Sequence, residues 1–333
     1  MRGAGAGPIK GYVPGWGVVS GVVSALEERF QGREFFFSLV VQEKQADMVT
    51  HLQDTVLKDC LTPALPWEDF TAVADRCLAD AAAAIRPLCP VSAPVDVFVA
   101  PYDFLNLKDA LMGRDAVRFP SVLFDRDLLG AVARGDTEKV PESLRQCPAW
   151  ASWDPAQALP LDMDLMVDGA YCRHVLALAG ESRSGLVEEC VTGHVEASLL
   201  KLFWRASLLG FPARRIRRFF EPMGDLGGLL DDIAGQAGPH NWPEIVGGPL
   251  GDLMARALEE PGNDPVGYFS EKAAVLFTTS ARAGRSQTAG PERVFAFMAE
   301  FYDQVTNLKL AVAGRLGNVG QDVLRRRLEL RYG

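Results

Sequence analysis

Three carboxylates lie close together near the middle of this 333-residue sequence. Asp162, Asp164 and Asp168 stand among leucines and methionines in the segment 161–168. Acids grouped in this way can act as general acid and general base. Acidic side chains also stabilise the exposed amide groups at the start of a helix. Because an apolar stripe with helical spacing follows directly, we interpret the three residues as helix-start residues.

Metal binding is the second chemistry that residue types suggest, at His194 with Glu196 and at Cys172 with His174. A zinc site needs three or four ligands at set spacings. The chain has only four histidines, and none belongs to an HExxH motif. We therefore predict no metal site. The six cysteines form no CxxC pair, which is typical of small buried side chains in a reducing compartment.

Motifs for phosphate binding and for nucleophilic catalysis are missing from the sequence. There is no GxxxxGK[ST] loop whose amides would bind phosphates. The glycines of segment 3–7 follow no strand and precede Pro8, so we expect a frayed end there. No serine stands in a GxSxG turn. We predict a protein that is not an enzyme and that binds no cofactor.

A compact basic run has two interpretations. Arg214, Arg215, Arg217 and Arg218 follow a predicted helix end, where positive charge complements the helix dipole. The run is either a solvated helix face or a docking patch for an acidic partner or phosphate headgroups. The net charge of −9 disfavours nucleic acid as the partner. We select the four arginines as possible partner-binding residues.

Helices are the elements that must position these groups. The composition, 48% apolar and 23% charged, is typical of a folded soluble protein. Apolar residues recur at spacings of three and four, which predicts amphipathic helices. Two shorter stripes run from Val167 to Leu178 and from Val195 to Leu209. The two longer ones are Phe70, Val73, Cys77, Ala81, Ala84 and Leu88, and Val294, Met298, Phe301, Val305, Leu308 and Val312.

Glycines follow the predicted helices and are expected to stop them: Gly113, Gly210, Gly314 and Gly317. We expect loops at 148–160, 235–251, 261–265 and 282–291.

No segment has the roughly 18 apolar residues that a membrane span needs, and we find no signal peptide. We therefore expect a cytoplasmic protein. Phe35–Val41 and Val95–Val99 resemble strands locally, but period alone cannot assign such short apolar runs.

A short motif recurs at intervals of roughly a hundred residues. Its first copy is YDFLNLK at 102–108, and its second copy is YDQVTNLK at 302–309. A third, degenerate copy, EASLLK at 196–201, lies between them. Asparagine is unfavourable inside a helix, so it predicts a buried amide with specific partners. The lysine would lay its stem on apolar surface. We assign to this structural motif Asn106, Lys108, Lys201, Asn307 and Lys309. Each copy closes one of three predicted blocks, at residues 1–117, 118–219 and 220–333.

Several of these segments resemble the family of central-stalk C subunits of A/V-type (archaeal and bacterial V-type) ATPases, to which the d subunit of the eukaryotic V-ATPase is related. Residues 161–171 are similar to its LDxxLDxxY helix start, with Val167-Asp168 as the second Leu-Asp. Residues 102–113 resemble its YDxxNLKxxL helix. Residues 191–210 and 295–317 resemble two further segments, with Leu199 and Arg315 at positions where the family has Asn and Lys. The resemblance covers roughly residues 45–333, including the ending 324–332, and the first forty residues depart from it.

The resemblance implies an all-α fold of three related helical domains in a pseudo-threefold, funnel-like arrangement. It also implies that Phe35–Val41 and Val95–Val99 are helical. The implied function is that of a non-catalytic rotor subunit in the central stalk. Its partners would be the D and F subunits of the central shaft and the membrane proteolipid ring, on the cytoplasmic side of the membrane.

Two other classes of protein fit the same pattern. An unrelated helical adaptor would also lack catalytic motifs, but tandem repeats of 34 to 47 residues are typical of that class. A soluble enzyme with a helical active site would need polar groups that converge in a pocket. The period near a hundred residues favours the rotor subunit.

Overall fold

The computed structural model describes residues 15–42, 45–61, 69–114, 118–134, 136, 138, 140–152, 159–236, 238–259 and 264–332. Within these ranges the chain is mostly helical and contains no strand, so the all-α prediction is confirmed. The glycine-rich segment 3–7 lies outside the described residues. The α-helices are α1 (Trp16–Leu26), α2 (Arg33–Val41), α3 (Gln45–Leu52), α4 (Phe70–Ile85), α5 (Ala93–Leu111), α6 (Arg126–Ala133), α7 (Glu142–Arg145), α8 (Pro160–Glu181), α9 (Gly185–Leu208), α10 (Ala213–Arg217), α11 (Leu226–Ala234), α12 (Trp242–Val246), α13 (Gly248–Glu259), α14 (Pro265–Arg282), α15 (Pro291–Leu316) and α16 (Gln321–Tyr332). Short 3-10 helices are η1 (Glu27–Arg29), η3 (Arg86–Leu88), η4 (Pro148–Ser152), η5 (Arg218–Phe220), η6 (Pro239–Asn241) and η7 (Ala283–Ser286).

The two strand-like segments are helical, as the family resemblance implied. Phe35–Val41 lies in α2, and Val95–Val99 lies in the first half of α5. Every residue from Ala93 to Ala100 is buried, so this half of α5 has neighbours on all sides. A helix buried all round needs apolar residues at consecutive positions, and this explains its strand-like sequence.

Three details of the helix prediction are wrong. In α4 the predicted stripe includes Ala84, which is exposed, whereas the buried face includes Ala74 and Leu78. The alanines of this helix suit either face, so the sequence does not determine the buried one. Leu209 ends the predicted stripe of α9 but is 73% exposed. The predicted loop 235–251 contains α12 and the start of α13.

The stripe of α15 is correct, and all six of its residues are buried. Stop residues also end two motif helices as expected. Gly113 after α5 and Gly210 after α9 have φ values of 67° and 73°, a left-handed conformation that glycine adopts without a steric cost. Of the two expected stops of α15, Gly317 directly follows the helix. Gly314 lies inside the helix, where a methyl group would collide with Leu324 of α16. Asn318 is the left-handed residue there, with φ of 54°.

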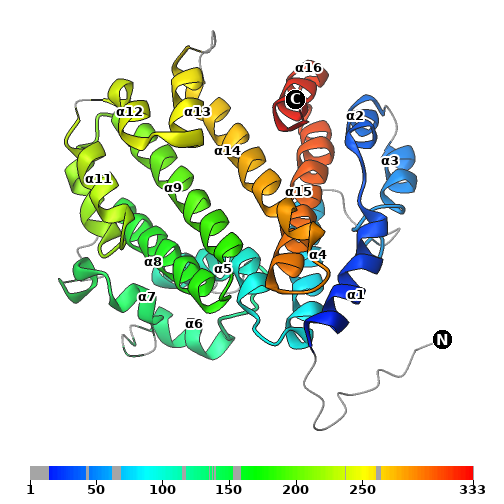
Figure 1. Ribbon diagram of the computed structural model, residues 1–333, viewed down its shortest axis with the longest axis horizontal. Coiled ribbons are helices and arrows are strands. Elements are labelled where there is room, and N and C mark those ends of the chain that lie inside the picture. The colour runs from blue at the N-terminus through cyan, green and yellow to red at the C-terminus, as the bar shows by residue number, and fades with distance from the viewer. Residues whose placement is uncertain are drawn as a thin grey trace.

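In the part of the chain that the structure describes, the six helices of 16 or more residues are α4, α5, α8, α9, α14 and α15, and Figure 1 shows their arrangement. They make three sequential pairs, α4 with α5, α8 with α9, and α14 with α15. Each second helix also packs on the first helix of another pair: α5 on α8, α9 on α14, and α15 on α4. α15 contacts α5 and α9 as well, so the second helices lie innermost.

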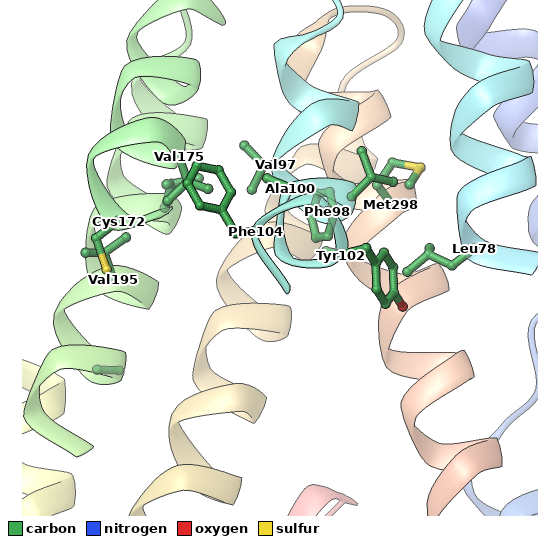
Figure 2. Packing of buried hydrophobic residues seen from close by; sticks show 14 of the residues in the cluster. Leu78, Val97, Phe98, Ala100, Tyr102, Phe104, Cys172, Val175, Val195 and Met298 are labelled. Carbon is green, nitrogen blue, oxygen red and sulfur yellow. The ribbon is translucent and has the colours of Figure 1, made fainter. Parts of the chain in front are cut away.

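One continuous hydrophobic core joins these helices. Figure 2 shows how α5 serves two sides of it: Phe104 lies toward Val175 of α8, and Tyr102 lies toward Leu78 of α4. Phe98 packs against Phe295 of α15 with ring centroids 5.1 Å apart. Dense packing of this kind makes a helical assembly stiff.

Helices α1 and α2, which come first in the chain, lie along α15 rather than on their sequence neighbours (Figure 1). Arg293 at the start of α15 forms an ion pair of 2.6 Å with Glu27. Gln304 and the backbone of Gln31 exchange two hydrogen bonds of 2.9 Å. The segment around α1 and α2 is thereby fixed to the opposite end of the sequence. Among the described residues, no helix has the length and apolar character to cross a membrane.

Candidate functional site: a repeated polar motif around a central cavity

The first motif copy lies in α5 and holds the segment that follows this helix. Asn106 is fully buried. Its amide nitrogen donates to the carbonyl of Phe119 at 3.0 Å, and its amide oxygen accepts from the Phe119 N–H at 2.9 Å. One turn earlier, the buried Asp103 accepts from the Phe124 N–H at 2.9 Å. Two side chains of α5 thus satisfy backbone groups of segment 118–124, which has no regular structure of its own.

The second copy lies in α15 and holds side chains of α16. The amide nitrogen of Asn307 donates to the Tyr332 hydroxyl at 2.9 Å and to the Asp303 carboxylate at 3.0 Å. Arg331 donates to the carboxylate of Asp303 and to the amide oxygen of Asn307. The same guanidinium reaches Glu271 of α14 at 3.0 Å. Burial raises the pKa of Asp303, and the charge of Arg331 opposes that shift.

The motif lysines of these two copies form ion pairs with the helix packed alongside. Lys108 of α5 lies 2.7 Å from Asp168 of α8. Lys309 of α15 lies 2.7 Å from Asp75 of α4. The same Asp75 oxygen accepts from the Tyr102 hydroxyl at 2.7 Å, so both intact copies meet at this carboxylate. Each lysine therefore links its helix to the first helix of another pair.

The third copy, in α9, breaks this rule. The two acids whose charges act on Lys201 are Asp168 and Glu271. Asp168 is held by Lys108, and Glu271 is held by Arg331. Within the described residues Lys201 makes no hydrogen bond and no ion pair, and burial lowers its pKa. The cation of the third copy is left without a counter-ion of its own.

Lys201 lines a cavity between the inner helices. One part has a volume of about 320 Å³ and extends along α5 and α9 from Phe98 and His194 to the two lysines Lys108 and Lys201. A second part, of about 190 Å³, lies between α9, α14 and α15 and reaches Arg331. Both parts share the same lining residues on α9, so they adjoin. Aromatic rings line the first part, and small and polar side chains line most of the second. The charged groups of the wall stand on α5, α8, α9, α15 and α16.

His194 gives this cavity a neutral polar group. Its ring lies 4.8 Å from the ring of Phe277, measured between centroids. Burial, together with the nearby charge of Lys201, lowers the pKa of His194 to about 4. The imidazole is therefore uncharged at neutral pH, and Lys201 is the cation beside it.

The four arginines that we selected for partner binding have mostly internal contacts. Arg215 and Arg218 reach Asp162 at 3.0 Å and 3.4 Å. Arg217 reaches Asp231 at 2.8 Å and is only 11% exposed. Arg214 is exposed and forms no ion pair among the described residues. Three of the four therefore fasten α10 and η5 to α8 and α11, which leaves Arg214 as the candidate for an outside partner.

The helix-start interpretation of the carboxylates is confirmed for Asp162, which lies in the first turn of α8. Asp164 and Asp168 lie further along and face Lys108 instead, at 3.5 Å and 2.7 Å. Sequence reasoning missed the roles of Asp75 and Arg331. Neither stands in a recurring pattern, so only their spatial proximity to the motif reveals them.

Histidines and cysteines are not gathered into a metal centre: the described ranges contain no group of three or more potential ligands. His174 and Cys172 pack in the core of α8. All six cysteines are free. Trp204 and Trp242 are each 1% exposed, so both are core residues.

In comparisons with known proteins, no family model matches the sequence, and no curated protein matches it. The arrangement can bind a partner in its cavity and can hold neighbouring helix pairs together. It offers a cavity with aromatic and charged lining, Lys201 without an ion pair among the described residues, and lysine–carboxylate pairs that link neighbouring helix pairs.

Proposed function

We propose that this chain is a non-catalytic rotor subunit in the central stalk of an A/V-type rotary ATPase. It acts as the socket that couples the central shaft to the membrane proteolipid ring, in ion transport with ATP synthesis or hydrolysis. The observation that carries this proposal is the cyclic packing of three helix pairs, with a cavity lined by residues of α5, α9 and α15.

The cyclic packing supports a pseudo-threefold fold of three related domains. In the order α5 on α8, α9 on α14 and α15 on α4, each contact joins the second helix of one pair to the first helix of another. We assign the pairs to domains at residues 1–117, 118–219 and 220–333. Each then contains one motif copy on its second helix, as three copies of one ancestral unit would.

A socket for torque must be stiff and hollow, and the contacts fit both needs. The core is continuous through all three pairs. Ion pairs of 2.7 Å at Lys108 and Lys309 tie neighbouring pairs together where a load would separate them. The cavity between α5, α9 and α15 has room for several side chains at the tip of an inserted shaft. We therefore assign this cavity to the shaft, which the D and F subunits form.

A second surface would face the proteolipid ring on the cytoplasmic side of the membrane. Arg214 is exposed in α10, a few residues after the exposed apolar residues Leu208 and Leu209 that end α9. We assign Arg214 to a partner contact at this end. Arg214→Glu should weaken binding to the ring or to the shaft, and unchanged affinity for both would contradict this assignment.

The direct test is binding of the purified chain to a separately purified D–F shaft complex from the same organism. We expect one-to-one co-elution and a single-site binding isotherm by calorimetry. No binding by a well-folded chain would overturn the socket function and favour a helical adaptor with a different partner.

A further inference from the structure

The charge left without a counter-ion in the cavity indicates what the inserted tip must carry. We infer that Lys201 receives a carboxylate from the tip of the shaft, so that one acidic side chain of the partner completes the third lysine–carboxylate pair. This inference rests on the proposed function, because it names the chemistry by which the socket holds its partner.

The three motif lysines differ in whether a carboxylate pairs with them. Lys108 and Lys309 each lie 2.7 Å from a carboxylate on the helix packed alongside. Lys201 occupies the same place in its motif and faces two acids. An ammonium group that is partly buried without a counter-ion is unfavourable, and burial lowers its pKa. A carboxylate brought in by a partner would remove that cost.

Neither of the two acids near Lys201 forms an ion pair with it, because both are paired with other cations. Arg331 of α16 takes Glu271 at 3.0 Å and also holds Asp303. Lys108 takes Asp168. The two acids near Lys201 are therefore neutralised by other cations. A carboxylate from outside would meet an unneutralised charge at this one side of the cavity.

Lys201 borders the open space of the cavity. Both parts of the cavity reach this residue, together with Ser198 and Tyr302. Aromatic rings of Phe98, Phe104 and Phe277 form much of the remaining wall. A side-chain carboxylate that enters between such rings is shielded from water, and shielding strengthens its ion pair with the lysine. An apolar tip with one Asp or Glu fits this lining.

The experiment compares the wild-type chain with three variants in calorimetric binding to the D–F complex. Lys201→Met keeps the length and apolar stem but removes the charge, and Lys201→Arg keeps the charge. Arg205→Met removes an exposed cation one turn further along α9 and controls for long-range attraction. Thermal unfolding of each variant checks that the socket is folded.

We expect the dissociation constant to rise roughly tenfold or more for Lys201→Met, because a shielded ion pair is lost. We expect near wild-type affinity for Lys201→Arg, and at most about a twofold change for Arg205→Met. Equal affinities of wild type and Lys201→Met would overturn the inference and leave the socket function intact.

Three further outcomes also overturn the inference. Equal weakening by Arg205→Met and Lys201→Met would show general attraction rather than a specific ion pair. Failure of the wild-type chain to bind the shaft would remove the socket function as well. Binding of benzoate, used as a small carboxylate probe, without binding of the shaft would make the cavity a small-ligand site.

Discussion

The motif copies in α5 and α15 use the same residue types to hold two different kinds of neighbour. In α5, Asp103 and Asn106 accept hydrogen bonds from backbone amides of segment 118–124. In α15, Asp303 and Asn307 bind the side chains of Arg331 and Tyr332. The second copy has one extra residue between its acid and its amide.

The two copies differ in whether they bind backbone groups or side chains, yet both fix a neighbouring segment to their helix. A backbone amide is offered by nearly every residue type, so the segment after α5 is free to vary in sequence. Arg331 and Tyr332 are specific side chains, so α16 must keep them in register with α15. The network of the second copy therefore contains a cation, Arg331, whereas Asp103 and Asn106 of the first copy bind backbone groups and need no cation.

The largest effect that separates the two copies should come from Arg331→Met. Arg331 is 7% exposed, and its loss leaves Asp303 and Glu271 without their cation. We expect the free energy of unfolding to fall by about 4 kcal/mol, as is usual when a buried ion pair loses one partner. Urea denaturation measures it. Arg327→Met, at an exposed site of the same helix, is the control, and an equal loss there would contradict the assignment.

The next largest effect should come from restoring the motif amide in the third copy, where Leu199 is 2% exposed. Leu199→Asn would bury an amide among apolar neighbours with no partner prepared for it. We expect a loss of about 3 kcal/mol in unfolding free energy. Leu199→Met keeps the apolar volume and should cost less than about 1.5 kcal/mol. A neutral effect of Leu199→Asn would mean that α9 retains a binding partner for the amide.

A smaller effect is expected from Asn106→Ala in the first copy. The change leaves the N–H and carbonyl of Phe119 without their partner, which should cost about 2 kcal/mol. Hydrogen exchange should also become faster in segment 118–124. Asn241→Ala, at an exposed position, is the control. Unchanged exchange in this segment would show that it is ordered without the motif.

The smallest effect concerns pH and the third copy. The pKa of His194 is about 4 in the folded chain, against an ordinary value of 6.5. Between these values the unfolded chain binds a proton that the folded chain does not, so stability falls as pH falls through this window. The slope from this residue is at most about 1.4 kcal/mol per pH unit.

His194→Gln should flatten that part of the profile, as measured by urea denaturation at pH 5 and pH 7.5. The exposed His240→Gln is the matched control and should leave the profile unchanged. A profile that is equally steep for wild type and His194→Gln would rule out a buried neutral imidazole in the cavity.

Apolar stripes with a helical period predicted four of the long helices, α4, α8, α9 and α15. The all-α class was implied by the family resemblance, since two segments looked like strands by local pattern. The sequence also predicted that the motif asparagines would be buried, since an asparagine inside a helix needs a tertiary reason. Asn106 and Asn307 are both 0% exposed. Local pattern is sufficient for such inferences.

The partners of these residues could not be predicted. Asp75 and Lys309 are far apart in the sequence and meet only because α15 packs on α4. The internal use of Arg215 and Arg217 was also hidden, because a basic run has the same sequence whether its partner lies inside or outside the protein. Asp231, which holds Arg217, lies on the next helix and follows no motif.

A closed circuit of helices built from one open chain has a seam that no peptide bond crosses. Here that seam is the contact of α15 with α4, and side chains alone hold it shut. The Asp75 carboxylate of α4 accepts hydrogen bonds from the Tyr102 hydroxyl of α5 and from the Lys309 ammonium of α15. It thereby links α15 to the first helix pair. The segment around α1 and α2 overlaps the joint through Glu27 and Gln31. Under a twisting load we expect the contact between α15 and α4 to separate before the parts of the ring that the chain connects covalently. This contact therefore limits the load that the ring of helices withstands.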